Sequence, residues 1–198
     1  MLKVGITGGI GAGKSTVAKV FQLLGIPLYN ADERAKLLVY NPIIRTQIVD
    51  LLGSKSYSQE GVYENKWIAS RVFQKPELLS KLNSIIHPAI AQDFSQWQSE
   101  QTSAYVLKEA ALLVEAGSFR ELDYLIVVTA PEQLKINRVQ ARDGRTLEQI
   151  KAIIAKQCSD EEKILHADFL ITNDEQQMVI PQVIKIHRLL LQHLQSIK

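Results

Sequence analysis

Cysteine is almost absent from this sequence: Cys158 is the only one in 198 residues. A single cysteine forms no internal disulfide and cannot supply a zinc cluster built from cysteines. Long apolar runs are absent too, since none approaches the roughly 20 residues of a membrane-spanning helix. The amino terminus begins with a strand pattern and has no basic segment followed by an apolar one, the pattern of a secretion signal. We therefore expect a soluble, cytoplasmic protein with no membrane partner.

Charge of either sign is not in excess. The chain has 23 Lys and Arg residues and 21 Asp and Glu residues, which gives a net charge of +2. Proteins that bind nucleic acids or membrane surfaces usually cluster a basic excess, so neither partner is expected. Local basic clusters would still suit a phosphorylated small molecule. The length and the 46% hydrophobic content are typical of one domain with a sizeable core.

Glycine is scarce, with ten in the chain, yet five of them fall within the stretch GITGGIGAGKST that begins at Gly5. The stretch follows an apolar strand pattern and continues into VAKVFQLLG, where apolar residues recur at helical spacing. Gly8, Gly13, Lys14 and Ser15 match G-x-x-x-x-G-K-[ST], the phosphate-binding loop. Glycines let successive N–H groups converge on phosphate oxygens, and the following helix adds partial positive charge. This pattern predicts a nucleotide-binding protein.

Each side chain of the loop has an expected task. Lys14 is expected to reach the β- and γ-phosphates, and the Ser15 hydroxyl to bind Mg²⁺. Thr16 is expected to contact the α-phosphate. The loop alone does not separate a kinase from a GTPase or a motor ATPase.

The order of strands and helices predicts an α/β fold of the P-loop NTPase type, with a parallel five-stranded sheet flanked by helices. A helical insertion at about 41–102 and a lid at about 136–160 interrupt a core of residues 1–40, 103–135 and 165–198, all within one kinase domain. The expected strands lie within Leu2–Thr7, Ile26–Asp32, Ser103–Leu113, Asp123–Ala130 and Ala167–Asp174.

Other P-loop classes lack support. A GTPase would need D-x-x-G and N-K-x-D motifs, and TNDE at 172–175 has no lysine. A motor ATPase usually has an apolar strand that ends in Asp-Glu, whereas DYLIVVTAPE has its Asp at the other end. Small-molecule kinases combine a compact sheet, a helical acceptor region and an arginine-rich lid, and this sequence has candidates for all three.

Three further motifs carry candidate chemistry. Asp32, at the end of the second strand, could accept a proton from an acceptor hydroxyl or help hold Mg²⁺, and it also suits a helix N-cap. Arg138 and Arg142 are four residues apart on one helix face, where they could offset charge on a triphosphate or form a solvated basic face. His87, which precedes Pro88, is by itself best interpreted as a structural histidine at a helix end.

Together these segments resemble the dephospho-coenzyme A kinase family. The opening GITGGIGAGKSTVAKVF is close to the opening of that family, and NAD followed by ERAK resembles its D-A-D-x-x-A-[RH] element. LNSIIHP resembles its L-x-x-I-x-H-P, and EAALLVEAG its P-L-L-[FY]-E segment. APEQLKINRVQARDG resembles its lid, and Gln157 with ADFLITN its closing Q…A-D-x-x-I-x-N. The matches run in the family's order from Ile6 to Asn173.

The resemblance implies ATP-dependent phosphorylation of the ribose 3′-hydroxyl of dephospho-coenzyme A, the last step of coenzyme A synthesis, with Mg²⁺ accompanying ATP. It implies that Asp32 is the general base and that Lys14, Arg138 and Arg142 assist transfer, with Ser15 on the metal. ATP would be held by Gly11, Ala12, Gly13, Lys14, Ser15, Thr16, Arg142 and Asn173, and the acceptor by Thr7, Asp32, His87, Leu112 and Glu115.

Some positions depart from the family's pattern. Asn30 replaces the first acidic residue of D-A-D, Ala111 replaces a proline, and Ile153 stands where an arginine is frequent. The alternatives are another P-loop small-molecule kinase, such as a nucleoside monophosphate kinase, and a nucleotide-dependent switch without catalysis. We expect ATP and dephospho-coenzyme A as partners of a monomer or weak homo-oligomer.

Overall fold

The computed structural model describes residues 1–72 and 75–196. The chain divides into two compact units. The first joins Met1–Asn30 to Gln101–Lys198, and the second is Ala31–Glu100. The first unit contains the whole sheet and the phosphate-binding loop.

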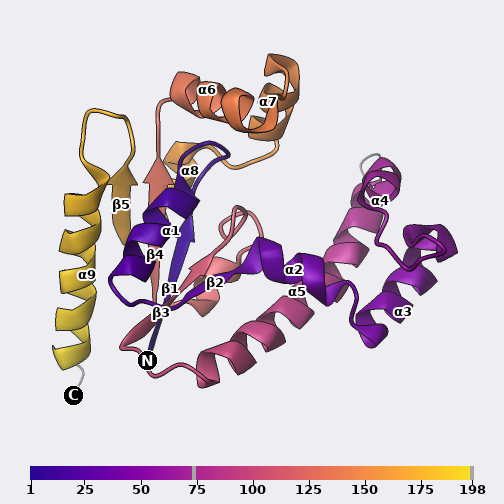
Figure 1. Ribbon diagram of the computed structural model, residues 1–198, viewed down its shortest axis with the longest axis horizontal. Coiled ribbons are helices and arrows are strands. Elements are labelled where there is room, and N and C mark those ends of the chain that lie inside the picture. Colours follow the sequence, from indigo (N-terminus) through magenta and orange to yellow (C-terminus); the bar gives the residue numbers. More distant parts are fainter. Residues whose placement is uncertain (73–74, 197–198) are drawn as a thin grey trace. The chain divides into compact units, whose positions relative to one another are not determined.

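A parallel sheet of five strands forms the centre of the first unit, in the order β2-β3-β1-β4-β5 (Figure 1). The predicted fold class is therefore confirmed. Strand β1 has its predicted range, and the other four strands are shorter than theirs. The strands are β1 (Leu2–Thr7), β2 (Leu28–Asn30), β3 (Tyr105–Glu109), β4 (Tyr124–Thr129) and β5 (Phe169–Thr172).

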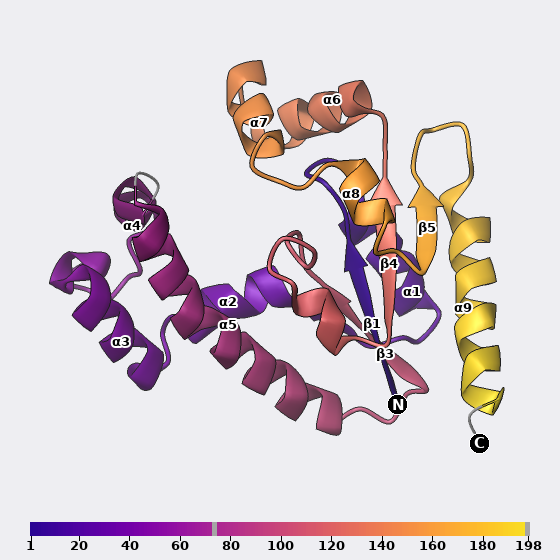
Figure 2. The same cartoon turned by 180° about the vertical axis from the view of Figure 1, so that it is seen from behind.

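Helices cover both faces of this sheet. Helices α1 (Lys14–Leu23) and α9 (Val179–Ser196) lie on one face and the short α8 (Asp160–Ile164) on the other (Figures 1 and 2). Alternation along β4 explains this, because successive side chains of a strand point to opposite faces. Ile126 packs in the cluster that includes residues of α1 and α9, whereas its neighbour Leu125 packs with Leu113 on the far side.

The region predicted to form a lid follows β4. The strand runs into α6 (Glu132–Asp143), and α7 (Leu147–Ile154) follows, beyond the carboxyl end of the sheet in Figure 1. Helices α7 and α8 each begin with a capping box, formed by Thr146 and Gln149 at α7 and by Ser159 and Glu162 at α8. These caps satisfy N–H groups that each helix start would otherwise leave unpaired.

The second unit is helical. It contains α2 (Ala31–Leu38), α3 (Pro42–Leu52), the 3₁₀ helix η1 (Ser54–Ser56), α4 (Asn65–Val72) and α5 (Pro76–Ser99). Buried residues such as Ile48, Ile68 and Leu82 form its own hydrophobic cluster. An ion pair between Arg34 and Asp93 joins α2 to α5.

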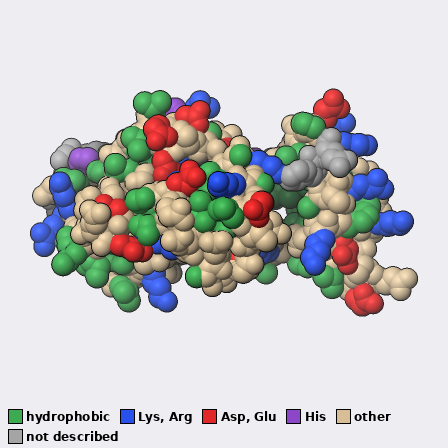
Figure 3. Space-filling model, turned by 90° about the horizontal axis from the view of Figure 1, so that it is seen from above, with side chains coloured by type: hydrophobic (Ala, Val, Ile, Leu, Met, Phe, Trp, Pro, Cys, Tyr) green, Lys and Arg blue, Asp and Glu red, His purple; other side chains and the backbone are tan. Residues whose placement is uncertain are grey.

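Surface charge is mixed, as the composition predicts. On the face that Figure 3 shows, acidic side chains are interspersed with basic and hydrophobic ones. Across residues 1–72 and 75–196, no helix combines the length and the apolar character needed to cross a membrane.

Candidate active site

The phosphate-binding loop joins β1 to α1. At two of its positions only glycine fits, because Asn173 and the backbone of Lys135 occupy the space that a Cβ would need. Gly11 and Gly13 have φ angles of 78° and 93°, which side-chain-bearing residues rarely adopt. A Cβ at Gly13 would lie 2.1 Å from Asn173 Nδ2, and one at Gly11 would lie 2.4 Å from the carbonyl oxygen of Lys135. Asn173 Nδ2 also donates to the Ala12 carbonyl at 2.8 Å. The loop is therefore packed between α6 and the residue that follows β5.

Lys14 lies across the loop that precedes it. Its Nζ donates to the carbonyl oxygens of Gly8 at 2.9 Å and Gly9 at 3.2 Å. Helix α1 begins at Lys14, and its N-cap residue Gly13 provides no side-chain acceptor. The first N–H groups of α1 thus have no capping side chain, which suits a phosphate ligand.

Glu109 is a site residue that the motifs did not single out. It is 4% exposed at the end of β3, and its Oε1 accepts a hydrogen bond from the Ser15 hydroxyl at 2.7 Å. Its Oε2 accepts one from Asn30 Nδ2 at 3.2 Å. The strand YVLKE contains a signal for it, since an acidic residue ends a buried parallel strand at the edge where ligands bind.

Ser15 and Glu109 have the oxygen donors that Mg²⁺ prefers, a hydroxyl and a carboxylate. Mg²⁺ is commonly bound by one or two protein carboxylates together with substrate phosphates. In the described part of the chain, no group of three or more His, Cys, Asp and Glu side chains could hold a metal ion. These residues therefore fit Mg²⁺ that is bound with a nucleotide.

The two predicted lid arginines lie in different surroundings. Arg138 Nη2 donates to the Asn173 carbonyl at 3.0 Å and to Glu175 Oε1 at 3.0 Å, which places this side chain beside the loop. Arg142 is 66% exposed and pairs with Asp143, its neighbour in sequence. Hydrogen bonding by Arg142 lowers the pKa of the Asp143 carboxyl. The structure therefore brings Arg138 to the loop and turns Arg142 to Asp143.

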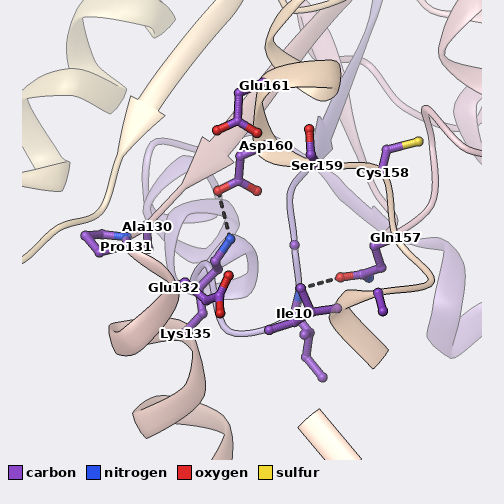
Figure 4. A pocket seen from close by; sticks show the side chains of 13 residues that line it. Ile10, Ala130, Pro131, Glu132, Lys135, Gln157, Cys158, Ser159, Asp160 and Glu161 are labelled. Atoms are coloured by element: carbon purple, nitrogen blue, oxygen red, sulfur yellow. Dashed lines mark hydrogen bonds and ion pairs between the residues drawn. The ribbon is translucent and has the colours of Figure 1, made fainter. Parts of the chain in front are cut away.

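A cavity of about 480 Å³ lies beside Gly9 and Ile10 of the loop (Figure 4). Lys135 of α6 forms an ion pair across it with Asp160 of α8, with Nζ 2.9 Å from Oδ2. At another wall, the backbone N–H of Ile10 donates to Gln157 Oε1 at 2.9 Å. A basic side chain of α6 and an acidic side chain of α8 thus meet beside the loop.

The predicted acceptor residues of the first unit differ in burial and in the contacts that they make. Thr7 is fully buried, and its hydroxyl donates to the Ala111 carbonyl at 3.3 Å. Leu112 is 49% exposed. Glu115 forms an ion pair with the fully buried Lys163, with a distance of 2.7 Å between Nζ and Oε1.

The other two candidates belong to the second unit. Asp32 is an exposed residue in the first turn of α2, two residues after the end of β2 at Asn30. His87 is exposed and lies within α5, because the helix continues through Pro88 to Ser99. The interpretation of His87 as a helix-end residue is therefore wrong.

Known proteins are similar to this chain over most of its length. The family model described as dephospho-CoA kinase matches residues 2–178. A dephospho-CoA kinase from Bacteroides fragilis is 38% identical over 187 residues, covering 93% of this chain and 91% of the relative. A Thermus thermophilus crystal structure superposes with a TM-score of 0.87 at 28% identity, covering 95% of this chain and 96% of that chain. A dephospho-CoA kinase structure from Campylobacter jejuni gives a TM-score of 0.69 at 26% identity and covers 96% of this chain and 98% of that one.

Proposed function

Because the chain belongs to the dephospho-CoA kinase family, we propose how its own residues carry out the final step of coenzyme A biosynthesis. The reaction moves the γ-phosphoryl group of ATP to the ribose 3′-hydroxyl of dephospho-CoA and releases ADP. The observation that carries the proposal is the loop between β1 and α1, where Lys14 and uncapped N–H groups converge beside Ser15 and Glu109.

The donor side binds and orients ATP. Backbone N–H groups from Gly11 to Thr16 hold the phosphate oxygens, and Lys14 exchanges its contacts with the Gly8 and Gly9 carbonyls for contacts with the β- and γ-phosphates. Arg138 is already beside the loop, and Arg142 leaves Asp143 to reach the transferring group. These cations stabilise the negative charge that spreads over the phosphoryl oxygens during transfer.

Ser15 and Glu109 are the residues that would hold Mg²⁺ with ATP. When bound, the ion neutralises phosphate charge and fixes the conformation of the triphosphate. Asn173 supports the loop through the Ala12 carbonyl, and we propose that it also contacts ATP, as the resemblance implies.

Asp32 is proposed as the general base. Its carboxylate accepts the proton of the 3′-hydroxyl while that oxygen attacks the γ-phosphorus in line and the bond to the β-phosphate oxygen breaks. Its exposure keeps the carboxylate available to an incoming hydroxyl. The acceptor contacts predicted for Thr7, His87, Leu112 and Glu115 stay predictions. We also propose a cytoplasmic protein that works as a monomer or weak homo-oligomer.

The test is ADP release with Mg·ATP in the presence of dephospho-CoA, AMP, dTMP or adenosine. Turnover only with dephospho-CoA, with a product phosphorylated at the ribose 3′ position, supports the proposal. Turnover with a nucleoside monophosphate instead would indicate another small-molecule kinase, and tight ATP binding without turnover on any acceptor would indicate a switch.

The role of Asp32 is tested separately with Asp32→Asn. This variant should lose turnover by about two to four orders of magnitude, the usual contribution of general acid–base catalysis, with the dissociation constant for ATP unchanged. Glu33→Gln, at the exposed neighbour in the same helix turn, is the matched control. Near-normal turnover by Asp32→Asn would show that another group accepts the proton.

A further inference from the structure

The segment Gln157–Asp160, which leads from α7 into α8, is attached to the rest of the first unit through three of its four residues. Gln157 accepts a hydrogen bond from the N–H of Ile10, at the tip of the phosphate-binding loop. The peptide groups of Cys158 are held by Glu115 and Lys163. Asp160 pairs with Lys135 (Figure 4).

Glu115, Lys163 and the backbone of Cys158 form a closed set of contacts. Glu115 Oε1 accepts from Lys163 Nζ at 2.7 Å and from the Cys158 N–H at 2.9 Å. Lys163 Nζ also donates to the Cys158 carbonyl at 2.5 Å. The two charged side chains therefore fix both polar groups of the residue that follows Gln157.

This ion pair is costly to bury, so stability alone explains it poorly. Lys163 is fully buried, and the side chain of Glu115 is 16% exposed. Both contacts of the Glu115 carboxylate, with Lys163 and with Cys158, are made by Oε1. Its other oxygen, Oε2, is buried and has no hydrogen-bond partner within the described residues. Buried ion pairs often add little stability over apolar side chains of the same size, and where they are retained they can specify a geometry.

The geometry specified here is that of the loop tip. A Cβ on Gly9 would lie 3.5 Å from Asp160 Oδ1, 3.7 Å from Gln157 Oε1 and 3.7 Å from Lys135 Nζ. These three polar groups therefore surround Gly9, while Gln157 fixes the next residue, Ile10. Figure 4 shows the Ile10–Gln157 and Lys135–Asp160 contacts against the same stretch of backbone.

We propose that Glu115 and Lys163 are positioning residues of the kinase. They fix the Cys158 peptide so that Gln157 holds the Ile10 N–H, and this keeps the tip of the loop in its phosphate-binding shape before ATP arrives. A loop ordered in advance binds its ligand more tightly, because less conformational entropy is lost on binding. The inference rests on the proposed function only in that the loop binds the phosphates of ATP.

Gln157→Met is the direct test, because methionine keeps the length and neutrality of the side chain and removes the acceptor oxygen. The amide exchange rate of Ile10 in the free protein should rise, and the dissociation constant for ATP should increase about tenfold, the scale of one lost hydrogen bond. The KM for dephospho-CoA should change less than about twofold. Gln133→Met is the control, since Gln133 is exposed and its side-chain amide donates to Asn137 of the same helix.

The ion pair is tested with both charges removed together. Glu115→Gln alone would leave the buried Lys163 charge without its partner and could prevent folding. The double variant Glu115→Gln/Lys163→Met removes both charges and retains an acceptor for the Cys158 N–H. We expect it to fold, to exchange the Ile10 amide faster than the wild type, and to bind ATP more weakly.

Two results would overturn the proposal. Unchanged Ile10 exchange in Gln157→Met would mean that Gln157 does not hold this amide. If Ile10 exchanged faster in either variant while the ATP dissociation constant stayed unchanged, the contacts of Gln157, Glu115 and Lys163 would stabilise the loop without contributing to ATP binding. ATP binding is measured without acceptor, so a wild-type protein that binds ATP and fails to phosphorylate dephospho-CoA would count against the proposed function alone.

Discussion

The hydroxyl of Ser15 donates to the carboxylate of Glu109 over 2.7 Å, and this contact joins the first turn of α1 to the end of β3. Asn30 of β2 donates to the other carboxylate oxygen, so Glu109 accepts hydrogen bonds from one strand and one helix. This arrangement explains why an amide is tolerated where the family pattern has an acidic residue. The amide donates to Glu109, whereas a second carboxylate would repel it.

Replacing Glu109 should weaken the metal site specifically. In Glu109→Gln the side-chain oxygen can still accept from Ser15, but the charge that would attract Mg²⁺ is lost. The Mg²⁺ concentration for half-maximal turnover should rise about tenfold or more, with Mg²⁺-free ATP binding unchanged. Titrating Mg²⁺ at saturating ATP, with Glu148→Gln as an exposed control, measures this; an unchanged requirement would remove Glu109 from the site.

Asn30→Asp should place two carboxylates against each other. One of them should then have a raised pKa, because two nearby negative charges disfavour ionisation. A folded-state pKa raised above the unfolded value destabilises the protein at neutral pH, and the loss is recovered as the pH falls through the raised pKa. We expect a loss of about 1–3 kcal/mol in the free energy of unfolding at pH 7.5 without Mg²⁺.

Urea denaturation at pH 7.5 and pH 5, with EDTA present, checks the Asn30→Asp prediction. The difference from the wild type should shrink at the lower pH. An equal difference at both values would mean that the two carboxylates do not interact.

Substitutions at two glycines with similar φ angles distinguish the effect of packing against the loop from the effect of backbone strain. Gly13 has φ 93° and Gly25 has φ 83°, but a Cβ at Gly13 would collide with Asn173 Nδ2 at 2.1 Å, whereas one at Gly25 would meet nothing within 4 Å. Gly25→Ala should cost about 1 kcal/mol of stability and leave ATP binding intact. Gly13→Ala should lose ATP binding by at least about a hundredfold, because Asn173 must move from the loop.

Calorimetric titration with ATP and thermal unfolding of both variants make the comparison. Equal ATP affinities in Gly13→Ala and Gly25→Ala would show that the loop accommodates the added methyl group.

His187 should make the stability of the protein depend on pH. Its Nδ1 lies 2.7 Å from the Tyr105 hydroxyl, and burial lowers the pKa of the imidazole. When the folded-state pKa of a base is lowered, the unfolded chain binds the proton first, so stability is complete above the unfolded value of about 6.5 and falls as the pH drops below it.

His187→Gln should therefore flatten the slope of unfolding free energy between pH 7 and pH 5 relative to the wild type. His193→Gln, at an exposed histidine of the same helix, is the control. A wild-type slope in His187→Gln would contradict the assignment.

The sequence by itself determined the nucleotide loop and the order of strands and helices along the chain. The loop is encoded in contiguous residues from Gly8 to Ser15, and strand and helix periods are local properties of the chain, so both could be predicted. Strand ends were predicted less well: β2 is only Leu28–Asn30, because α2 begins at Ala31 and takes the last two residues of the predicted strand.

Only the tertiary structure decided which distant side chains serve the loop. Glu109 lies 94 residues from Ser15, and Gln157 lies 147 residues from Ile10, so no local pattern links either pair. The parallel sheet brings them together, because it aligns the carboxyl ends of β1, β3 and β4 at one edge, and the chain between α7 and α8 returns to the loop there. Only the structure shows that Lys163 and Glu115 form a buried ion pair. In the sequence they are ordinary charged residues, whereas inside the fold a buried charge requires a partner of opposite charge.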